Sequence, residues 1–268
     1  YMGTVDKNNL VNFYDGQIRV VAPSGKEFVK YPAKDYMQHI SEHVEPWTYL
    51  KFPYLKNIGW KGFEDGPDSG VYCATPLSRL NAANGMATPK AQEAFEKMYD
   101  TLSQKTNGRY QPIHHRLATH WARLIELLYA AERMQELITD PEITDPNVRI
   151  EVTNTPTEGI GSVEAPRGTL THHFWTDENG ILTKVNLIVG TTNNYAPITM
   201  SLKKAAKSLI SNGTVINEGL LNKIEMAFRA YDPCFSCATH ALPGQMPLEV
   251  TIRDAEGTEV ERLQQYVD

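Results

Sequence analysis

Two thiols and an imidazole lie within seven residues near the end of the chain, at Cys234-Phe235-Ser236-Cys237-Ala238-Thr239-His240. The C-x-x-C spacing lets both sulfurs turn toward one point, and thiolates favour zinc, nickel, copper(I) or iron over magnesium and calcium. Pro233 biases Asp232 away from helical geometry. The apolar residues upstream recur at helical spacing: Leu220, Leu221, Ile224 and Phe228. We therefore expect a helix that ends just before a metal-binding turn.

The composition narrows the class of protein. The 268 residues can bury a substantial core, as one large domain or two small ones. A formal net charge of -6 argues against a nucleic-acid partner, and no window approaches the roughly 20 apolar residues that span a bilayer. Three cysteines do not make a disulfide scaffold, so we expect a reducing, cytoplasmic compartment. Because the first residue is Tyr1 rather than methionine, we expect that something upstream is missing.

The hydrophobic pattern favours an α+β fold. Apolar periodicity predicts helices over residues 34–44, 88–107, 115–139, 198–211 and 215–230. Alternation between turn signals predicts a short meander over residues 11–29 and hairpins over 171–189 and 248–263. We expect a helical core of about four to five main helices with peripheral antiparallel β-hairpins. In the helix over 115–139, the stripe expected to face the core is Leu117, Trp121, Leu124, Leu128 and Leu137 or Ile138.

Four segments together resemble one family. The nine residues Asp232 to His240, which read DPCFSCATH, resemble the C-terminal signature of the large subunit of nickel-iron hydrogenases. Residues 164–173, EAPRGTLTHH, are similar to its E-A-P-R-G-x-L-x-H-H motif. Residues 190–194, GTTNN, resemble part of V-P-[ST]-T-x-N, with Gly190 in place of the proline. Residues 70–81, GVYCATPLSRLN, resemble G-V-Y-R-V-G-P-L-A-R-L-N and depart from it at Cys73, Ala74 and Thr75.

The resemblance implies roles for single residues around a nickel-iron centre whose iron carries cyanide and carbon monoxide. Cys234 would be a terminal nickel ligand and Cys237 the ligand that bridges nickel and iron. Arg167 would hang over the open side of the metal pair, with Asp232 as its acidic neighbour. Two further residues would line the cyanide pocket, Pro166 with its ring and Thr191 with its hydroxyl. A magnesium or similar ion would be bound by His240 and the backbone of Leu187.

The resemblance also implies a domain organisation and partners. Residues 1–240 would be the C-terminal part of a large subunit of the cytoplasmic group 3 type, and residues 241–268 an extension normally removed on maturation. The N-terminal half, on the same or a separate chain, would supply an R-x-C-G-x-C motif. Further partners would be an iron-sulfur small subunit, a maturation endopeptidase, nickel chaperones and an electron-acceptor module linked to NAD, the deazaflavin F420 or a heterodisulfide. The reaction would be reversible heterolytic cleavage of H2.

Other interpretations stay open on the residues alone. C-x-x-C by itself is more often half of a structural zinc site or a redox dithiol. A zinc-binding or dithiol assembly protein derived from the same fold would fit, and so would an immature precursor or one half of a naturally split enzyme. Arg167, between a proline and a glycine, is either a rigidly held donor fork or part of an ordinary surface turn. Cys73 stands alone, so we expect a buried small side chain rather than a third metal ligand.

Overall fold

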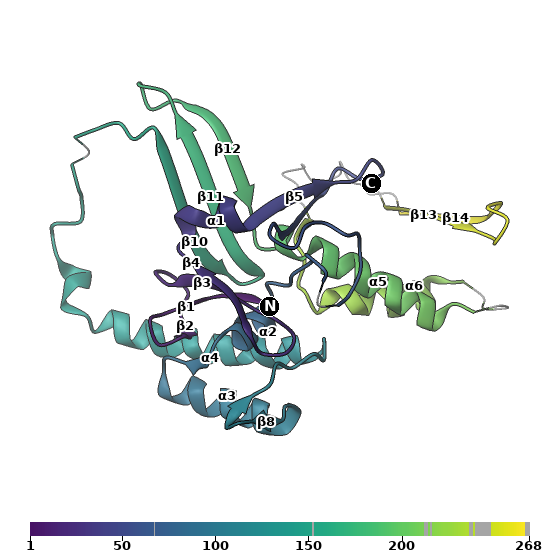
Figure 1. Ribbon diagram of the computed structural model, residues 1–268, viewed down its shortest axis with the longest axis horizontal. Helices are drawn as coiled ribbons and strands as arrows, with labels where there is room; N and C mark the ends of the chain where they lie inside the picture. The colour runs from purple at the N-terminus through teal and green to yellow at the C-terminus, as the bar shows by residue number, and fades with distance from the viewer. Residues whose placement is uncertain are drawn as a thin grey trace.

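The computed structural model describes residues 1–66, 68–151, 153–211, 214, 216–235, 238 and 248–265. A five-stranded sheet with the order β4-β3-β1-β2-β7 lies beside the helix pair α3 and α4 (Figure 1). Its strands are β1 (Met2–Val5), β2 (Leu10–Val11), β3 (Gln17–Val21), β4 (Glu27–Tyr31) and β7 (Gly85–Met86). The meander expected over residues 11–29 is therefore only partly correct. Strand β3 pairs with β4 as expected, but β1 lies between β3 and β2.

Two long helices form the larger part of the core. Helix α3 (Pro89–Leu102) begins at Pro89 as the sequence predicts and packs on α4 (Ala118–Ile138). Between the sheet and these helices lies α2 (Pro76–Ala82), every residue of which is buried. The joint core contains Leu77, Leu80, Phe95, Met98, Ile113, Ala122, Ile125 and Tyr129. This packing places a short, fully enclosed helix at the centre of the domain.

The face of α4 that packs on the core is only partly the one expected, because Trp121 and Leu128 pack against the core but other members of the expected stripe do not. Leu117, Leu124 and Ile138 are 68%, 65% and 70% exposed. The buried face carries instead Ala118, Thr119, Ala122, Ile125, Glu126 and Tyr129. Small residues let the helix backbones approach closely, and a buried arginine on α2 takes Glu126 into the interior. Ranking side chains by hydrophobicity alone therefore predicts only part of the buried face.

The helix expected over residues 34–44 is correct only in its first part, because residues 40–44 form a strand. After a 3-10 turn at Ala33–Asp35, helix α1 (Tyr36–His39) makes a single turn. Strand β5 (Ile40–Val44) follows and pairs with β6 (Lys51–Leu55), with Ile40 opposite Leu55. The β-branched ends of β5 suit a paired strand, so pairing with a distant segment overrides the local helical pattern.

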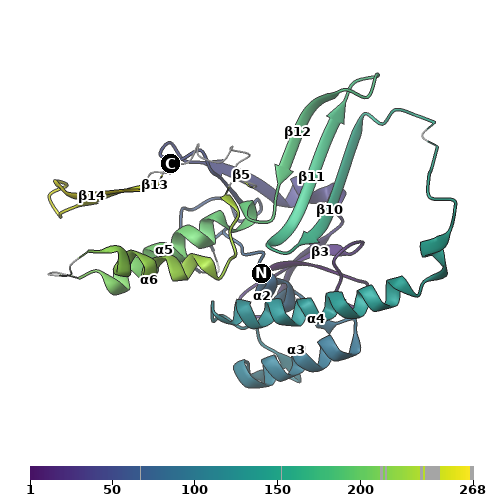
Figure 2. The same ribbon diagram turned by 180° about the vertical axis from the view of Figure 1, so that it is seen from behind.

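The second half of the chain forms an extended three-stranded sheet, called the arm, and a pair of helices (Figures 1 and 2). Strands β10 (Glu158–Ala165), β11 (Gly168–Thr176) and β12 (Leu182–Ile188) make a three-stranded antiparallel sheet that extends away from α3 and α4. A 3-10 turn, η3 (Thr192–Asn194), leads into α5 (Tyr195–Leu209), which lies beside α6 (Glu218–Arg229). The remaining elements are the hairpins β8 (Lys105–Thr106) with β9 (Arg109–Tyr110) and β13 (Leu248–Arg253) with β14 (Glu259–Gln265), and the 3-10 turn η2 (Pro141–Thr144).

The predicted α+β class is confirmed, as are the helices α3, α4, α5 and α6 and the hairpins near residues 171–189 and 248–263. Among the described helices, none is both long enough and apolar enough to cross a membrane. Strand β11 contacts both β1 and η3, and residues 164–173 and 190–194 of the resemblance motifs lie at this junction.

One carboxylate on α4 stabilises the start of α3. Glu132 accepts hydrogen bonds from the Thr88 hydroxyl (2.6 Å) and from the backbone N–H groups of Ala91 (2.9 Å) and Lys90 (3.1 Å). Desolvation raises the pKa of this carboxyl, but these hydrogen bonds outweigh it and hold the pKa below its usual value of 4.5. Because the folded pKa is the lower one, the stabilisation is present above about pH 4.5 and is lost as the pH falls through the folded pKa.

We expect Glu132→Gln to lower the melting temperature at pH 7 by a few degrees, because the helix loses a charged acceptor at its N-terminus. The difference from the unmodified protein should shrink in acid, where Glu132 itself becomes protonated. Glu136→Gln is the matched control, since Glu136 lies one turn further along α4 in an exposed pair with Arg133. Thermal unfolding between pH 3 and 8 checks this. Equal shifts in both variants would contradict the assignment.

Candidate functional site at the β10–β11 turn

A two-residue turn, Pro166–Arg167, joins β10 to β11, with Ala165 paired opposite Gly168. Gly168 has φ +152°, and a Cβ there would lie 2.3 Å from the Ala74 carbonyl oxygen and 2.7 Å from that of Gly190. Only glycine fits such a position, because two backbone segments press against it. The turn that presents Arg167 is therefore packed against residue 74 on one side and residue 190 on the other.

The side-chain amide of Asn194 forms hydrogen bonds with all three segments, at residues 74, 167 and 190. Its Oδ1 accepts from the Ala74 N–H (2.9 Å), and its Nδ2 donates to the carbonyl of Arg167 (3.0 Å) and, at 3.3 Å each, to those of Ala74 and Gly190. Asn194 is 1% exposed, so each of these bonds is shielded from water. Within residues 190–194 the motif pointed only to Thr191, and nothing in it gave Asn194 a role.

Arg167 meets the turn that follows α6. Its Nε donates to the backbone carbonyl of Asp232 (2.6 Å) and lies 3.3 Å from the Asp232 Oδ2. Both side chains are partly exposed, at 38% and 47%. Asp232 has φ +51°, a left-handed conformation that Asp adopts more readily than most residues. The predicted stop of the helix before Pro233 is confirmed, because α6 ends at Arg229.

Thr191 connects the same junction to the first cysteine of the pair. The backbone N–H of Cys234 donates to the Thr191 Oγ1 at 3.1 Å, and Thr191 is 4% exposed. The structure thus brings together four residues that the sequence singled out at widely spaced positions: Arg167, Thr191, Asp232 and Cys234. Pro166 is their neighbour in the turn. Leu187 lies on β12, opposite His172 of β11.

Two of the expected residues, Cys237 and His240, lie outside the described residues. Within the described part of the chain, no three or more His, Cys, Asp or Glu side chains gather as a metal-binding group. Of the predicted side-chain metal ligands, only Cys234 lies within the described residues. The sulfur of Cys234, beside Thr191, therefore fits one part of a thiolate site.

Cys73 is a buried residue, as expected, and lies next to an arginine that the sequence analysis did not single out. It is 7% exposed and shares a cluster with Ile198 and Tyr231. Nη1 of Arg116 lies 3.4 Å from its Sγ, and the same guanidinium stands over the Tyr231 ring at 4.4 Å. Tyr231 directly precedes Asp232, so Arg116 and Cys73 pack against the residue before the turn at Asp232.

Comparisons with known proteins agree on one family. Residues 74–240 match the family model described as nickel-dependent hydrogenase. The chain is 50% identical over 266 residues to an F420-non-reducing hydrogenase iron-sulfur subunit of Archaeoglobus profundus, covering 99% of this chain and 53% of that protein. It is 42% identical over 258 residues to the NAD-reducing hydrogenase HoxS subunit beta of Cupriavidus necator, covering 96% and 50%.

A solved structure agrees with these sequence matches. The fold superposes on a crystal structure of NAD+-reducing [NiFe]-hydrogenase in the H2-reduced state with a TM-score of 0.77 and 38% identity, over 89% of this chain and 50% of that one. The chain spans about half the length of the relatives it matches.

Proposed function

Because the chain belongs to the nickel-dependent hydrogenase family, we propose that it is the C-terminal half of a large subunit that catalyses reversible heterolytic cleavage of H2. The observation that carries this proposal is the junction at which the Pro166–Arg167 turn meets Thr191 and the Asp232–Cys234 turn. An enzyme of this kind needs thiolates, a fixed cation and a hydroxyl donor around one point. The described residues include a cysteine sulfur, an arginine and a threonine hydroxyl at this junction.

In this proposal Cys234 and Cys237 would hold nickel, Cys237 would also hold an iron that carries cyanide and carbon monoxide, and His240 with the Leu187 backbone would hold a magnesium or similar ion. A bound nickel-iron centre would supply Lewis-acid and redox chemistry toward H2. The protein's own part is to position charge and move a proton. Arg167 and the Cys237 thiolate are the groups proposed to handle that proton, and Asp232 orients the guanidinium.

Pro166 and Thr191 are proposed to line the pocket for the cyanide. The Thr191 oxygen accepts a hydrogen bond from Cys234, which leaves the hydroxyl hydrogen to be donated. Since Thr191 is buried, a polar partner for that hydrogen is valuable, and leaving such a group unpaired costs about 1–3 kcal/mol. A cyanide nitrogen is an acceptor of the required kind.

The finer assignment follows from the resemblance. We propose that residues 1–240 belong to the large-subunit domain of a cytoplasmic group 3 enzyme and that residues 241–268 are an extension removed on maturation. The proposed partners are the N-terminal half with its R-x-C-G-x-C motif, an iron-sulfur small subunit, an electron-acceptor module, a maturation endopeptidase and nickel chaperones. One relative is named as NAD-reducing and another as F420-non-reducing, so their names do not select one electron acceptor for this chain.

The test of this function is Arg167→Lys in the enzyme assembled with its other half and its small subunit. We expect nickel content to stay unchanged and turnover to fall about 10-fold or more, an estimate from the effects of positioned acid-base groups. Lysine has no N–H at the place of the Arg167 Nε, which makes the contacts with both the carbonyl and the carboxylate of Asp232, so an ammonium cannot reproduce them. H2 oxidation rates and elemental analysis measure the two quantities separately.

The matched control is Arg229→Lys. Arg229 is exposed on the last turn of α6, pairs with Glu225 and precedes Asp232 by three residues, so the same substitution there should leave turnover unchanged. Loss of metal in Arg167→Lys without a separate kinetic defect would make Arg167 structural. Zinc in place of nickel and iron in the unmodified enzyme would favour the zinc-binding or dithiol protein instead.

A further inference from the structure

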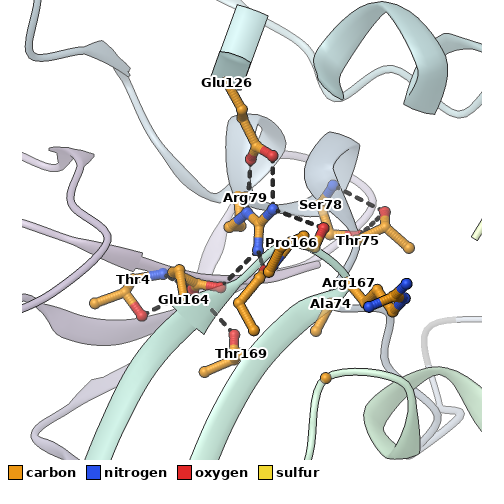
Figure 3. Close-up of polar contacts among 12 residues, drawn as sticks. Thr4, Ala74, Thr75, Ser78, Arg79, Glu126, Glu164, Pro166, Arg167 and Thr169 are labelled. Atoms are coloured by element: carbon orange, nitrogen blue, oxygen red, sulfur yellow. Dashed lines mark hydrogen bonds and ion pairs between the residues drawn. The ribbon is translucent and has the colours of Figure 1, made fainter. Parts of the chain in front are cut away.

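Arg79 uses every donor of its guanidinium inside the protein (Figure 3). It lies on α2 and is 1% exposed. Nε and Nη2 bind the two carboxylate oxygens of Glu126 on α4, each at 2.6 Å. Nη1 binds the Glu164 carboxylate at 2.9 Å. The two remaining N–H groups donate to backbone carbonyls, that of Ala165 at 2.5 Å and that of Pro166 at 3.3 Å. All five N–H groups of an arginine are thereby satisfied.

The two carboxylates are themselves held in place. Glu164 Oε1 accepts from the Thr4 N–H (2.7 Å), the Thr4 hydroxyl (2.8 Å) and the Thr169 hydroxyl (3.0 Å). Burial raises the pKa of Glu126, while its two bonds to Arg79 act in the opposite direction. Buried charges persist only when their partners are well placed, and removing one partner is costly. The cluster joins β1, α2, α4 and the β10–β11 hairpin into one rigid unit.

The two carbonyls that Arg79 binds belong to the residues directly before Arg167. The Asn194 amide binds the carbonyl of Arg167 itself, so the two-residue turn is held on both sides. A turn this short has little freedom left once its flanking carbonyls are fixed. Arg79 and Asn194 together therefore fix the backbone from which the Arg167 side chain extends.

We propose that Arg79 is a positioning residue for Arg167, acting through the backbone of Ala165 and Pro166. The proposal deepens the proposed function and rests on it. Arg79 touches neither Cys234 nor the Arg167 side chain in the described contacts, so its influence passes through the turn. A lysine at position 79 could not replace it, because one ammonium offers three donors from a single point rather than five in a plane.

The experiment uses the assembled enzyme with Arg79→Lys, Arg167→Lys and the double variant. A displacement of about 1 Å at a reacting group can cost up to about 100-fold in rate, so we expect Arg79→Lys to lower kcat about 10-fold with nickel content and KM for H2 unchanged. In the Arg167→Lys background the same change should have almost no further effect, because residues that act through one another are not additive. Amide hydrogen exchange should rise at residues 165–169 and stay unchanged at residues 172–176.

Arg19→Lys is the matched control. Arg19 is 9% exposed, pairs with Glu27 and donates to the backbone carbonyl of Ala82, but it contacts no residue of the turn. Arg19→Lys should reduce the stability of the protein without changing kcat per nickel. If Arg79→Lys does not assemble, Glu126→Gln replaces it, since it removes one charge while keeping the size of the side chain, and a smaller fall in kcat with the same non-additivity is expected.

Multiplicative effects in the double variant, or equal losses of kcat in Arg19→Lys, would overturn the proposal and leave Arg79 as a general stabilising residue. An unmodified enzyme without hydrogen activity would overturn the proposed function instead. In that case the rise in hydrogen exchange at residues 165–169 would still decide whether Arg79 fixes the turn.

Discussion

Cys237→Ser is expected to remove nickel and hydrogen activity together from the assembled enzyme. The resemblance gives Cys237 the bridging position, and one thiolate shared by two metals has no neutral oxygen equivalent. A serine hydroxyl does not lose its proton under conditions in which a metal-bound thiol does. Cys237 itself lies outside the described residues. Its partner Cys234 is described, and its backbone is tied to Thr191 beside Arg167.

Cys73→Ser is the control for this prediction, because it makes the same chemical change at a cysteine outside the motif. The Cys73 sulfur lies against Arg116 and Asn194, and a hydroxyl can accept from the same guanidinium. We expect metal content and turnover near those of the unmodified enzyme. Nickel and iron analysis with H2 oxidation rates checks both variants. Metal retained with full activity in Cys237→Ser would refute the assignment of the site, and equal loss of metal in both variants would show that Cys73 is also a ligand.

The predictable part of the site consists of short contiguous segments. The residues around Arg167, Thr191 and Cys234 each carry local chemistry that the sequence displays, and the turns at Pro166–Arg167 and Pro233 follow from proline and glycine. That these segments lie close together in the fold is implied only by the resemblance. The contacts that achieve it, above all those of Asn194, join backbone groups about 120 residues apart.

The unpredicted part depends on partners far away in the sequence. Arg79 satisfies its five donors with acceptors 47 to 87 residues further on, and no local pattern indicates such a set. The buried face of α4 is only partly predictable for a related reason. From the sequence Glu126 is expected at the surface, but its ion pair with Arg79 lies in the interior. Leu124 is expected in the core, but Ala122 lies there instead and Leu124 is exposed. Tertiary contacts override periodicity at both positions.

The central claim is that this chain supplies only part of a nickel-iron centre. The resemblance implies four thiolates, of which Cys234 and Cys237 are two. The chain has only one other cysteine, Cys73, which is buried against Arg116. Half of a ligand set binds weakly, because each thiol must first lose a proton from a pKa near 8.5.

The most direct test compares the 268-residue chain expressed alone with the same chain expressed together with the other half of the large subunit and the maturation proteins. Nickel, iron and the infrared bands of bound cyanide and carbon monoxide are measured in both preparations. We predict neither stoichiometric nickel nor those bands in the chain alone, and both in the assembled enzyme. Stoichiometric nickel together with the cyanide and carbon monoxide bands in the chain alone would contradict the claim.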